Sequence, residues 1–268
     1  MKLDLSNVLI AAPVNNEEVF RDNLLASPLA KRPGINVIAR RGYPCAGKAL
    51  NEVIRKAGAS QLVVCAHQDV FLPEGWEQRL FSNIRVIEGD CDNWGVLGVY
   101  GISSQSRRAG KVWSTGLGKE IRGDSPLPVE VQSLDELLLV IRADTDVLFD
   151  EDLPGFHLYG TDIVQNAYAR GLKAFVIDAP VIHNSLPVAY LGVDYWQAYL
   201  YLRRKWKERL PIHTAVVPIT SFPWELIKHN LTSFVKSATN RRGRPTRHKN
   251  PAQLADQLAY SHRRASYR

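Results

Sequence analysis

The sequence has few cysteines and no long apolar run. Its three cysteines, Cys45, Cys65 and Cys91, form no CxxC pair and no even set, which excludes a disulfide-stabilised scaffold and favours a reducing compartment. No apolar segment approaches the ~20 residues that a membrane-spanning helix needs. The first residues, MKLDLSNVLIAAP, carry Asp4 and Asn7 within the apolar stretch, so we expect no signal peptide. Together these features predict a cytoplasmic protein.

Negative charge is scarce in the last quarter of the chain. Residues 203–268 contain 15 Lys and Arg against 3 Asp and Glu, whereas residues 1–202 contain 19 against 24. This asymmetry predicts a mildly acidic body at 1–190 and a basic, largely helical extension at 191–268, in which 240–250 is disordered. Such an extension can bind an anionic surface, for example the inner face of a membrane to which the protein is peripheral.

The chain shows an alternation of strand and helix signals. Strands are predicted at 8–12, 35–39, 62–66, 94–101, 137–141, 174–177 and 181–182, and helices at 17–29, 46–57, 76–84, 161–170, 194–209 and 251–260. Residues 103–125 have little periodicity and are expected to form a long loop. The alternation predicts an α/β fold with a mixed, mainly parallel sheet and helices on both faces. The aromatic face of 194–209 is expected to dock on this body.

Polar groups follow one of the predicted strands at once. In VVCAHQDVFLPEGW, residues 63–76, an unbroken apolar run ends and His67, Gln68 and Asp69 come directly after it. Ligands of open parallel sheets bind beyond the carboxyl ends of the strands. A carboxylate at such a place can hold Mg²⁺ or Mn²⁺, or it can merely cap the following turn. Spacing alone does not decide between a metal site and a cap.

The same stretch resembles the DxD region of glycosyltransferases with the GT-A fold, in the family 2-like group that includes a streptomycin-biosynthesis protein. Four further segments are similar in the same order, and the resemblance covers about residues 7 to 185: VLIAAPVNN (8–16), GKALNEVIRKAGASQLVV (47–64), GFHLYGTDIVQNAYARG (155–171) and VIHNS (181–185). The resemblance implies transfer of a sugar, with inversion, from a nucleotide-sugar donor to a hydroxyl acceptor, a glycan or lipid-linked glycan.

The resemblance also implies roles for individual residues. Asp69 and His183 would bind Mn²⁺ or Mg²⁺, and Asp162 would be the general base that deprotonates the acceptor. The residues expected to meet the donor are Pro13, Asn15, Asn16, Arg40, Arg41, Asn51, His67 and Gln68. Those expected near the acceptor are Trp113, Tyr159, Gly160 and Thr161. His67 stands where the family has the first acid of DxD, so it either binds the metal or contacts the donor alone.

Several of these residues have a structural alternative. Asp162 follows Thr161, a predicted helix cap, and can simply offset the helix dipole. His183 can be a hydrogen-bonded histidine at a strand end, and Trp113 can pack under a loop rather than on a sugar. Because the first acid of DxD is replaced, a non-catalytic sugar-nucleotide binder also remains an alternative.

Two other motifs point to different classes of protein. GYPCAGKA, residues 42–49, has the GxxxxGK spacing of a phosphate-binding loop, but Ala49 replaces the hydroxyl that holds Mg²⁺ and Pro44 removes an amide. Residues 242–245, RGRP, resemble the core of a minor-groove hook. Each is a single short match, so neither a nucleotide hydrolase nor a nucleic-acid-binding protein is the favoured interpretation.

Overall fold

The computed structural model describes residues 3–58, 61–187, 191–239 and 246–262. The helices are α1 (Glu17–Asp22), α2 (Ala46–Ile54), α3 (Trp76–Asp90), α4 (Tyr159–Ala169), α5 (Val193–Lys205), α6 (Trp224–Thr239) and α7 (Pro251–Gln257). The strands are β1 (Val8–Pro13), β2 (Asn36–Arg40), β3 (Leu62–Ala66), β4 (Val70–Phe71), β5 (Trp94–Gly98), β6 (Tyr100–Ser103), β7 (Arg108–Ser114), β8 (Lys119–Arg122), β9 (Val129–Leu134), β10 (Leu138–Arg142), β11 (Lys173–Val176) and β12 (Val181–His183).

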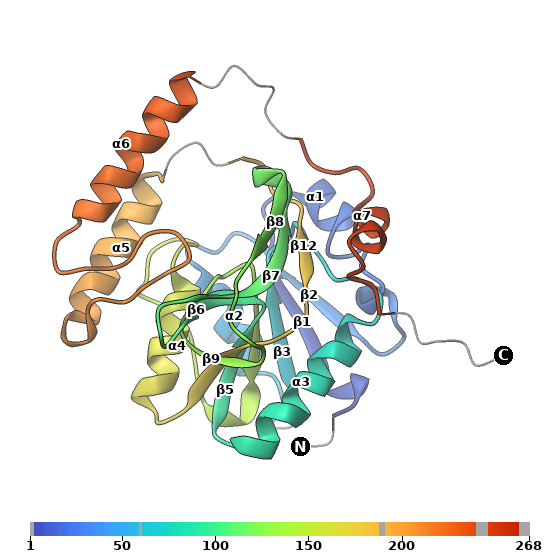
Figure 1. The fold of residues 1–268 in the computed structure, drawn as a ribbon. Coiled ribbons are helices and arrows are strands. Elements are labelled where there is room, and N and C mark those ends of the chain that lie inside the picture. Colours follow the sequence, from blue (N-terminus) through green and yellow to red (C-terminus); the bar gives the residue numbers. More distant parts are fainter. Residues whose placement is uncertain (1–2, 59–60, 188–190, 240–245, 263–268) are drawn as a thin grey trace.

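Within this described part of the chain, one sheet runs in the order β2-β1-β3-β10-β5-β11-β9-β6-β7-β12-β4, with β8 beside β7. In its central part, from β2 to β11, β10 alone runs against the other strands. Helices α2, α4 and α5 pack on one face and α1 and α3 on the other (Figure 1). The predicted fold class, a mixed α/β fold with helices on both faces of the sheet, is confirmed.

The far end of the sheet returns to the end of β3. β4 follows β3 after a turn of three residues, 67–69, yet β4 lies at the other end of the strand order, where it pairs with β12. The sheet therefore curls until its last strands stand beside the carboxyl end of β3. This curl brings together residues that lie far apart in the sequence.

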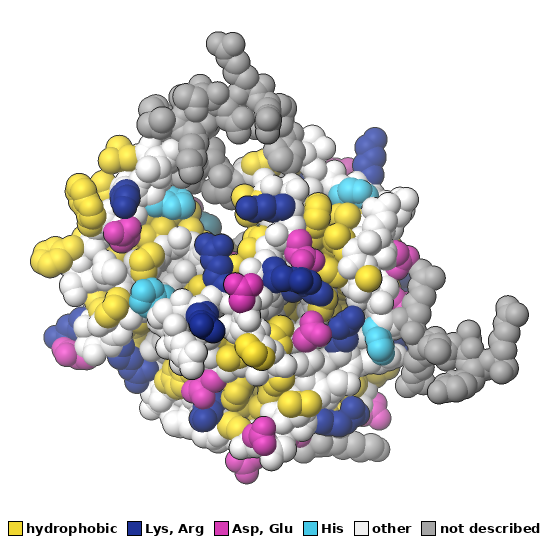
Figure 2. Space-filling model, viewed as in Figure 1, with side chains coloured by type: hydrophobic (Ala, Val, Ile, Leu, Met, Phe, Trp, Pro, Cys, Tyr) yellow, Lys and Arg dark blue, Asp and Glu magenta, His cyan; other side chains and the backbone are white. Residues whose placement is uncertain are grey.

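The basic C-terminal region packs on the fold. Tyr195, Tyr199 and Leu202 of α5 are at most 3% exposed and belong to the main core, which confirms the predicted docking of this aromatic face. The start of α6 is different, because Phe222 and Trp224 remain exposed, and Figure 2 shows hydrophobic side chains gathered there at the left of the view. Across the described ranges, none of the helices is both long and apolar enough to traverse a bilayer.

The structure corrects several predicted elements. Residues 103–125 are not a loop, since β7 and β8 form a hairpin within them; the alternating burial of β7 was hidden by its glycine and charged residues. The predicted helix 17–29 stops at Asp22, because the Asn23 side chain bonds back to the Val19 carbonyl and turns the chain. Residues 240–245 lie outside the described residues, so their predicted disorder and the RGRP match are not addressed. Residues 246–250 form defined hydrogen bonds.

Candidate metal and donor site

The three residues of the candidate metal site are placed by sheet topology. His67 is the first residue after β3, and Asp69 is the last before β4. His183 ends β12 and lies opposite Val70 in the antiparallel β4–β12 pair. The backbone N–H of Asn184 also donates to the Asp69 carbonyl over 2.8 Å. The curl of the sheet thus places His183 next to the turn at residues 67–69, whose polar residues were identified from the sequence.

His67, Asp69 and His183 form a compact group, the triad. One ligand atom of each lies within 4.8 Å of those of the other two. The His183 Nε2 is 3.4 Å from the Asp69 Oδ1, and the His67 and His183 ring centroids are 5.8 Å apart. The Asp69 and His183 side chains are 15% and 21% exposed, so the group is partly buried but still reaches solvent.

Tyr159 orients His67 in the triad. Its hydroxyl donates to the Glu136 carbonyl over 3.1 Å and lies 3.0 Å from the His67 Nε2. Because the hydroxyl has one proton and that proton is already donated, the His67 Nε2 must carry the hydrogen of the second bond. Nδ1 is then the unprotonated nitrogen, and it is the atom that can bind a metal.

Electrostatics prepare the triad for a cation. Burial lowers the pKa of His67 to about 4, so its ring is neutral at physiological pH. Burial alone would raise the pKa of Asp69, but His183 beside it overrides that effect and the pKa is lowered, leaving a carboxylate. Burial disfavours protonation of His183, whereas Asp69 favours it and raises its pKa. At a pH below the raised pKa of His183, a metal ion would have to displace the proton of this ring.

The donor set fits a divalent transition metal. Two imidazole nitrogens and one carboxylate oxygen suit Mn²⁺ better than Mg²⁺, which prefers oxygen ligands. The hydrogen bond that the His67 Nε2 donates to Tyr159 is the outer contact that metal-binding histidines usually have. These residues fit the metal that the resemblance implies, and His67 lies close enough to Asp69 and His183 to be a third ligand.

Asn15, Asn16 and Gln68, three residues expected to meet the donor, lie together, and Gln68 stands between His67 and Asp69 in the chain. The Gln68 Oε1 accepts from the backbone N–H groups of Asn15 and Asn16, each over 3.0 Å. The Gln68 Nε2 donates to the Asn15 Oδ1 over 2.6 Å. Gln68 therefore holds the turn after β1 against the end of β3. Both asparagines are exposed, and a ligand at the triad would meet this turn.

Three predicted donor residues have other partners. Arg40 pairs with Glu52 and Tyr43, and Arg41 pairs with Glu17, 3.0 Å from Nη2 to Oε2. Asn51 is fully buried. Its side chain accepts from the Phe149 N–H over 2.9 Å and donates to the Phe149 carbonyl over 2.8 Å, which holds α2 against the segment before α4. The complete burial of Asn51 corrects its predicted donor contact, and the donor contacts of Arg40 and Arg41 stay predictions. Pro13 ends β1 beside Arg40 and pairs with it in the sheet.

Asp162 does not have the environment of a general base. Its carboxylate is 1% exposed and accepts from the Lys205 Nζ over 2.8 and 2.9 Å. The Trp206 Nε1 and the Asn166 Nδ2 donate to it over 2.7 and 3.1 Å. Burial raises the pKa of Asp162, although Lys205 opposes this. The carboxylate faces α5 and joins it to α4, so the predicted catalytic role is corrected to a structural one.

Of the predicted acceptor residues, Tyr159 alone has a hydrogen bond to the triad. Trp113 packs against the cluster formed by Phe71 and other residues beneath α7. Thr161 is 1% exposed, and a Cβ on Gly160 would lie 2.5 Å from the Leu134 carbonyl oxygen, so both serve close packing of α4. Thr161 is also not the helix cap, because that position belongs to Leu158 in a left-handed conformation.

Two acidic residues beside the triad were missed in the sequence. Asp135 and Glu136 directly precede β10, and because β10 is antiparallel, its start lies at the carboxyl end of β3. The Glu136 Oε1 accepts from the Leu158 N–H over 3.1 Å. Burial, and then the neighbouring Asp135, raise the pKa of Glu136 to about 8. Two acids before the apolar run at 137–141 were visible in the sequence. The sequence did not show that this strand is antiparallel to β3, so the acids could not be placed at the same edge as His67 and Asp69.

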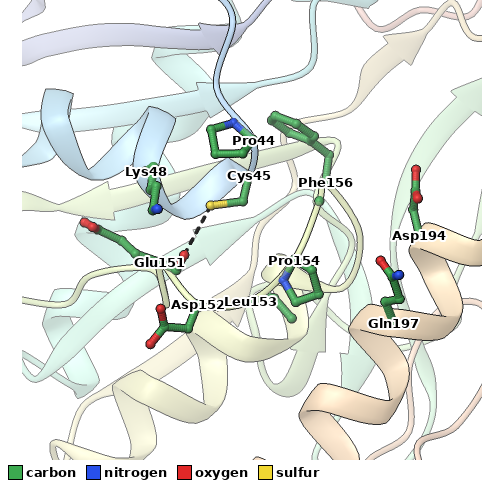
Figure 3. Close-up of a pocket in the computed structure, with 11 residues that line it drawn as sticks. Pro44, Cys45, Lys48, Glu151, Asp152, Leu153, Pro154, Phe156, Asp194 and Gln197 are labelled. Carbon is green, nitrogen blue, oxygen red and sulfur yellow. Dashed lines mark hydrogen bonds between the residues drawn. The ribbon is translucent and has the colours of Figure 1, made fainter.

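A pocket of about 430 Å³ opens beside α2 (Figure 3). Its walls include Lys48 and Phe156, and the Cys45 Sγ bonds the Glu151 carbonyl across one side. The GxxxxGK segment forms this wall and not a phosphate cradle. The Ala46 N–H donates to the Gly155 carbonyl over 3.0 Å, and a Cβ on Gly47 would lie 2.3 Å from the Asp150 carbonyl oxygen. The geometry does not fit a nucleotide-hydrolase loop.

Comparisons with known proteins find distant similarities. No family model matches the chain. The protein "ATP synthase subunits region ORF 6" of Fuscovulum blasticum is 29% identical over 136 residues, 47% of this chain and 53% of that protein, so the chain spans about half the length of this curated relative. Among solved structures, the mannosyltransferase PcManGT from Pyrobaculum calidifontis, in complex with GDP-Man and Mn²⁺, has a TM-score of 0.45 at 13% identity, over 94% of this chain and 79% of that one.

Two further solved structures are similar at the same level. GalNAc-T7, with UDP, GalNAc and Mn²⁺, has a TM-score of 0.44 at 14% identity, over 87% of this chain and 49% of that one. TarS of S. aureus has a TM-score of 0.44 at 15% identity, over 74% of this chain and 39% of that one.

Proposed function

We propose that this protein is a metal-dependent glycosyltransferase that uses a nucleotide-sugar donor and a hydroxyl acceptor. The observation that carries the proposal is the triad of His67, Asp69 and His183 at the carboxyl end of β3, where a sheet of this kind binds its ligands. The Asn15–Asn16 turn beside it offers the side chains and backbone that a nucleotide would meet.

The residues of the site have complementary tasks. Asp69 and the two histidines would hold a divalent cation, which would supply Lewis acidity against the negative charge that grows on the leaving diphosphate. Tyr159 fixes the His67 tautomer, and Gln68 fixes the donor-side turn. Neutral His67 and ionised Asp69 need no proton change to act as ligands.

The acceptor hydroxyl needs a carboxylate near the reacting sugar. Asp162 is buried against Lys205, so we place this task on the Asp135–Glu136 pair, whose charges act on the triad histidines. A carboxyl group whose pKa is about 8, as for Glu136, lies near the operating pH where proton transfer is efficient. Attack from the side opposite the diphosphate gives inversion, and a glycan or lipid-linked glycan is the acceptor class.

A binding screen tests the class of donor. UDP-, GDP-, dTDP- and CMP-sugars are added with and without Mn²⁺, and the melting temperature is followed. A donor present at about 100 times its dissociation constant stabilises the fold by about 2.7 kcal/mol. For a chain of this size that is a rise of about 5–10 °C. We expect one nucleotide class to give this rise only with Mn²⁺. If none of the four nucleotide sugars raises the melting temperature while Mn²⁺ alone still binds, the proposed nucleotide-sugar donor is wrong.

Transfer itself separates an enzyme from a binding protein. With the donor identified, release of the free nucleoside diphosphate in the presence of candidate acceptors is measured for the wild type and for Asp69→Asn. We expect turnover with Mn²⁺ and its loss in the variant. Donor binding without turnover for any hydroxyl acceptor would favour a non-catalytic sugar-nucleotide binder.

A further inference from the structure

Asn184, the residue after His183, is fastened to the C-terminal segment. Asn184 is 2% exposed. Its Nδ2 donates to the Asn23 Oδ1 over 2.8 Å and to the His248 carbonyl over 2.9 Å, and its Oδ1 accepts from the His248 N–H over 2.7 Å. The Arg247 Nε donates to its carbonyl over 3.1 Å. One buried side chain therefore links α1, the end of β12 and residues 247–248.

The rest of this segment, 246–262, is seated firmly on the sheet edge; we call it the strap. Leu254 and Tyr260 are buried against β4 and β12, and the Tyr260 hydroxyl donates to the Glu120 Oε2 over 2.6 Å. At its end the His262 N–H donates to the Glu74 carbonyl over 2.6 Å. Gly75 allows this contact, because a Cβ there would lie 2.2 Å from the His262 carbonyl oxygen. The strap therefore has fixed positions at both ends.

The strap brings a cation to the triad. The Arg247 Nε is bound to the carbonyl of Asn184, which directly follows His183, and the N–H of Asn184 donates to the Asp69 carbonyl over 2.8 Å. The guanidinium therefore lies close to the triad, and, although burial acts the other way, its charge helps His183 and His67 to lower the pKa of Asp69. Arg247 is half-buried. Within residues 3–58, 61–187, 191–239 and 246–262, its Nε bond to Asn184 is its one hydrogen bond, and neither terminal nitrogen has an ion-pair partner. A held arginine with two open donors stands beside the metal site.

An open guanidinium at this place matches a particular ligand chemistry. Its terminal N–H groups present a planar fork that binds phosphate oxygens in pairs. A diphosphate bound at the triad, beside the turn at Asn15–Asn16, would carry charge that a divalent cation neutralises only in part. We infer, on the basis of the function proposed above, that Arg247 binds the donor diphosphate and that the strap is part of the donor site.

Other uses of the strap are outcomes of the test. The basic residues could serve only to latch the strap to the sheet, in which case Arg247 contributes its bond to the Asn184 carbonyl and nothing to ligand binding. Lys249 offers a matched control, because it is an exposed cation two residues further along the same segment. Removing it takes away the same charge without touching the guanidinium.

Calorimetric titration of UDP and GDP, with and without saturating Mn²⁺, tests the inference. The variants are Arg247→Gln, Arg247→Lys and the control Lys249→Gln. Losing charge-assisted bonds to phosphate should weaken nucleoside diphosphate binding about 10- to 100-fold in Arg247→Gln. Arg247→Lys should keep part of the affinity. Lys249→Gln should stay within about twofold of the wild type, and the affinity for Mn²⁺ alone should be unchanged in all three.

Loosening the strap provides a second measurement. Leu254→Ala removes a buried contact of α7 and, as a single substitution, should weaken diphosphate binding. Added to Arg247→Gln, it should weaken binding no further, because both changes act through Arg247. Unchanged diphosphate affinity in Arg247→Gln, whatever its melting temperature, would overturn the inference. A wild type that binds none of UDP, GDP and dTDP, and none of the sugar nucleotides of the donor screen, would instead overturn the proposed function.

Discussion

Replacing Lys205 by methionine tests the corrected role of Asp162. The Lys205 Nζ contacts Asp162 twice, the Asp150 Oδ2 over 2.7 Å and the Asn166 Oδ1 over 3.1 Å. Methionine has a similar length but no charge, so it leaves the carboxylate of Asp162 buried without its cation. Breaking a buried ion pair from one side costs about 3–5 kcal/mol. For a chain of this size that lowers the melting temperature by about 6–20 °C.

Thermal and denaturant unfolding near neutral pH measure this cost. Lys207→Met is the matched control, since Lys207 is 73% exposed and pairs with an exposed glutamate over 3.5 Å, so its loss should change stability by no more than about 0.5 kcal/mol. The difference in the free energy of unfolding between Lys205→Met and the wild type should become smaller as the pH falls. Burial raises the pKa of Asp162, and the protonated acid needs no neighbouring cation.

Asp162→Asn completes the test. If Asp162 joins α4 to α5, this variant also loses stability, but its transfer activity per folded molecule stays close to that of the wild type. A variant that melts like the wild type but has lost transfer would return Asp162 to the catalytic site. A melting temperature of Lys205→Met within about 1 °C of the wild type would refute the buried network.

Three further outcomes follow from the site. Tyr159→Phe removes the hydrogen bond that fixes the His67 tautomer, and Mn²⁺ affinity should fall about 10- to 100-fold by calorimetry with the fold intact; unchanged affinity would exclude the orienting role. Because the pKa of His183 is raised and the metal must displace its proton, Mn²⁺ affinity should increase about tenfold per pH unit below that pKa and then level off; a flat profile between about pH 5 and 8 would exclude His183 as a ligand. Asp135→Asn and Glu136→Gln should lower kcat by about two to four orders of magnitude in one of the two, with little change in donor affinity; full activity in both would exclude the acidic pair as the base.

The sequence could predict what local pattern controls. The run from Leu62 to Ala66 is a fully buried strand at the predicted bounds, and the polar residues follow it at the carboxyl end of the strand. His183 was placed by the resemblance alone, because its approach to Asp69 depends on the pairing of β12 with β4 across a curled sheet. No periodicity in either segment encodes that pairing.

Features that depend on contacts between residues far apart in the chain could not be predicted from sequence patterns. The helical face of Asp162 was readable, but the lysine that pairs with it comes from α5, so the carboxylate was interpreted as catalytic. The residues around Arg247 have the composition of a disordered tail, yet Asn184 and the α7 contacts order them. Glu136 was overlooked because an antiparallel strand within a parallel sheet reverses which end faces the ligand.

The most direct test is manganese binding to the purified protein, followed by electron paramagnetic resonance during titration. We expect one Mn²⁺ per chain in the wild type, with loss of this site in Asp69→Asn and in His183→Ala while both variants remain folded. A wild type that leaves manganese free in solution, or variants that bind it as tightly as the wild type, would contradict the assignment of these side chains to a metal centre.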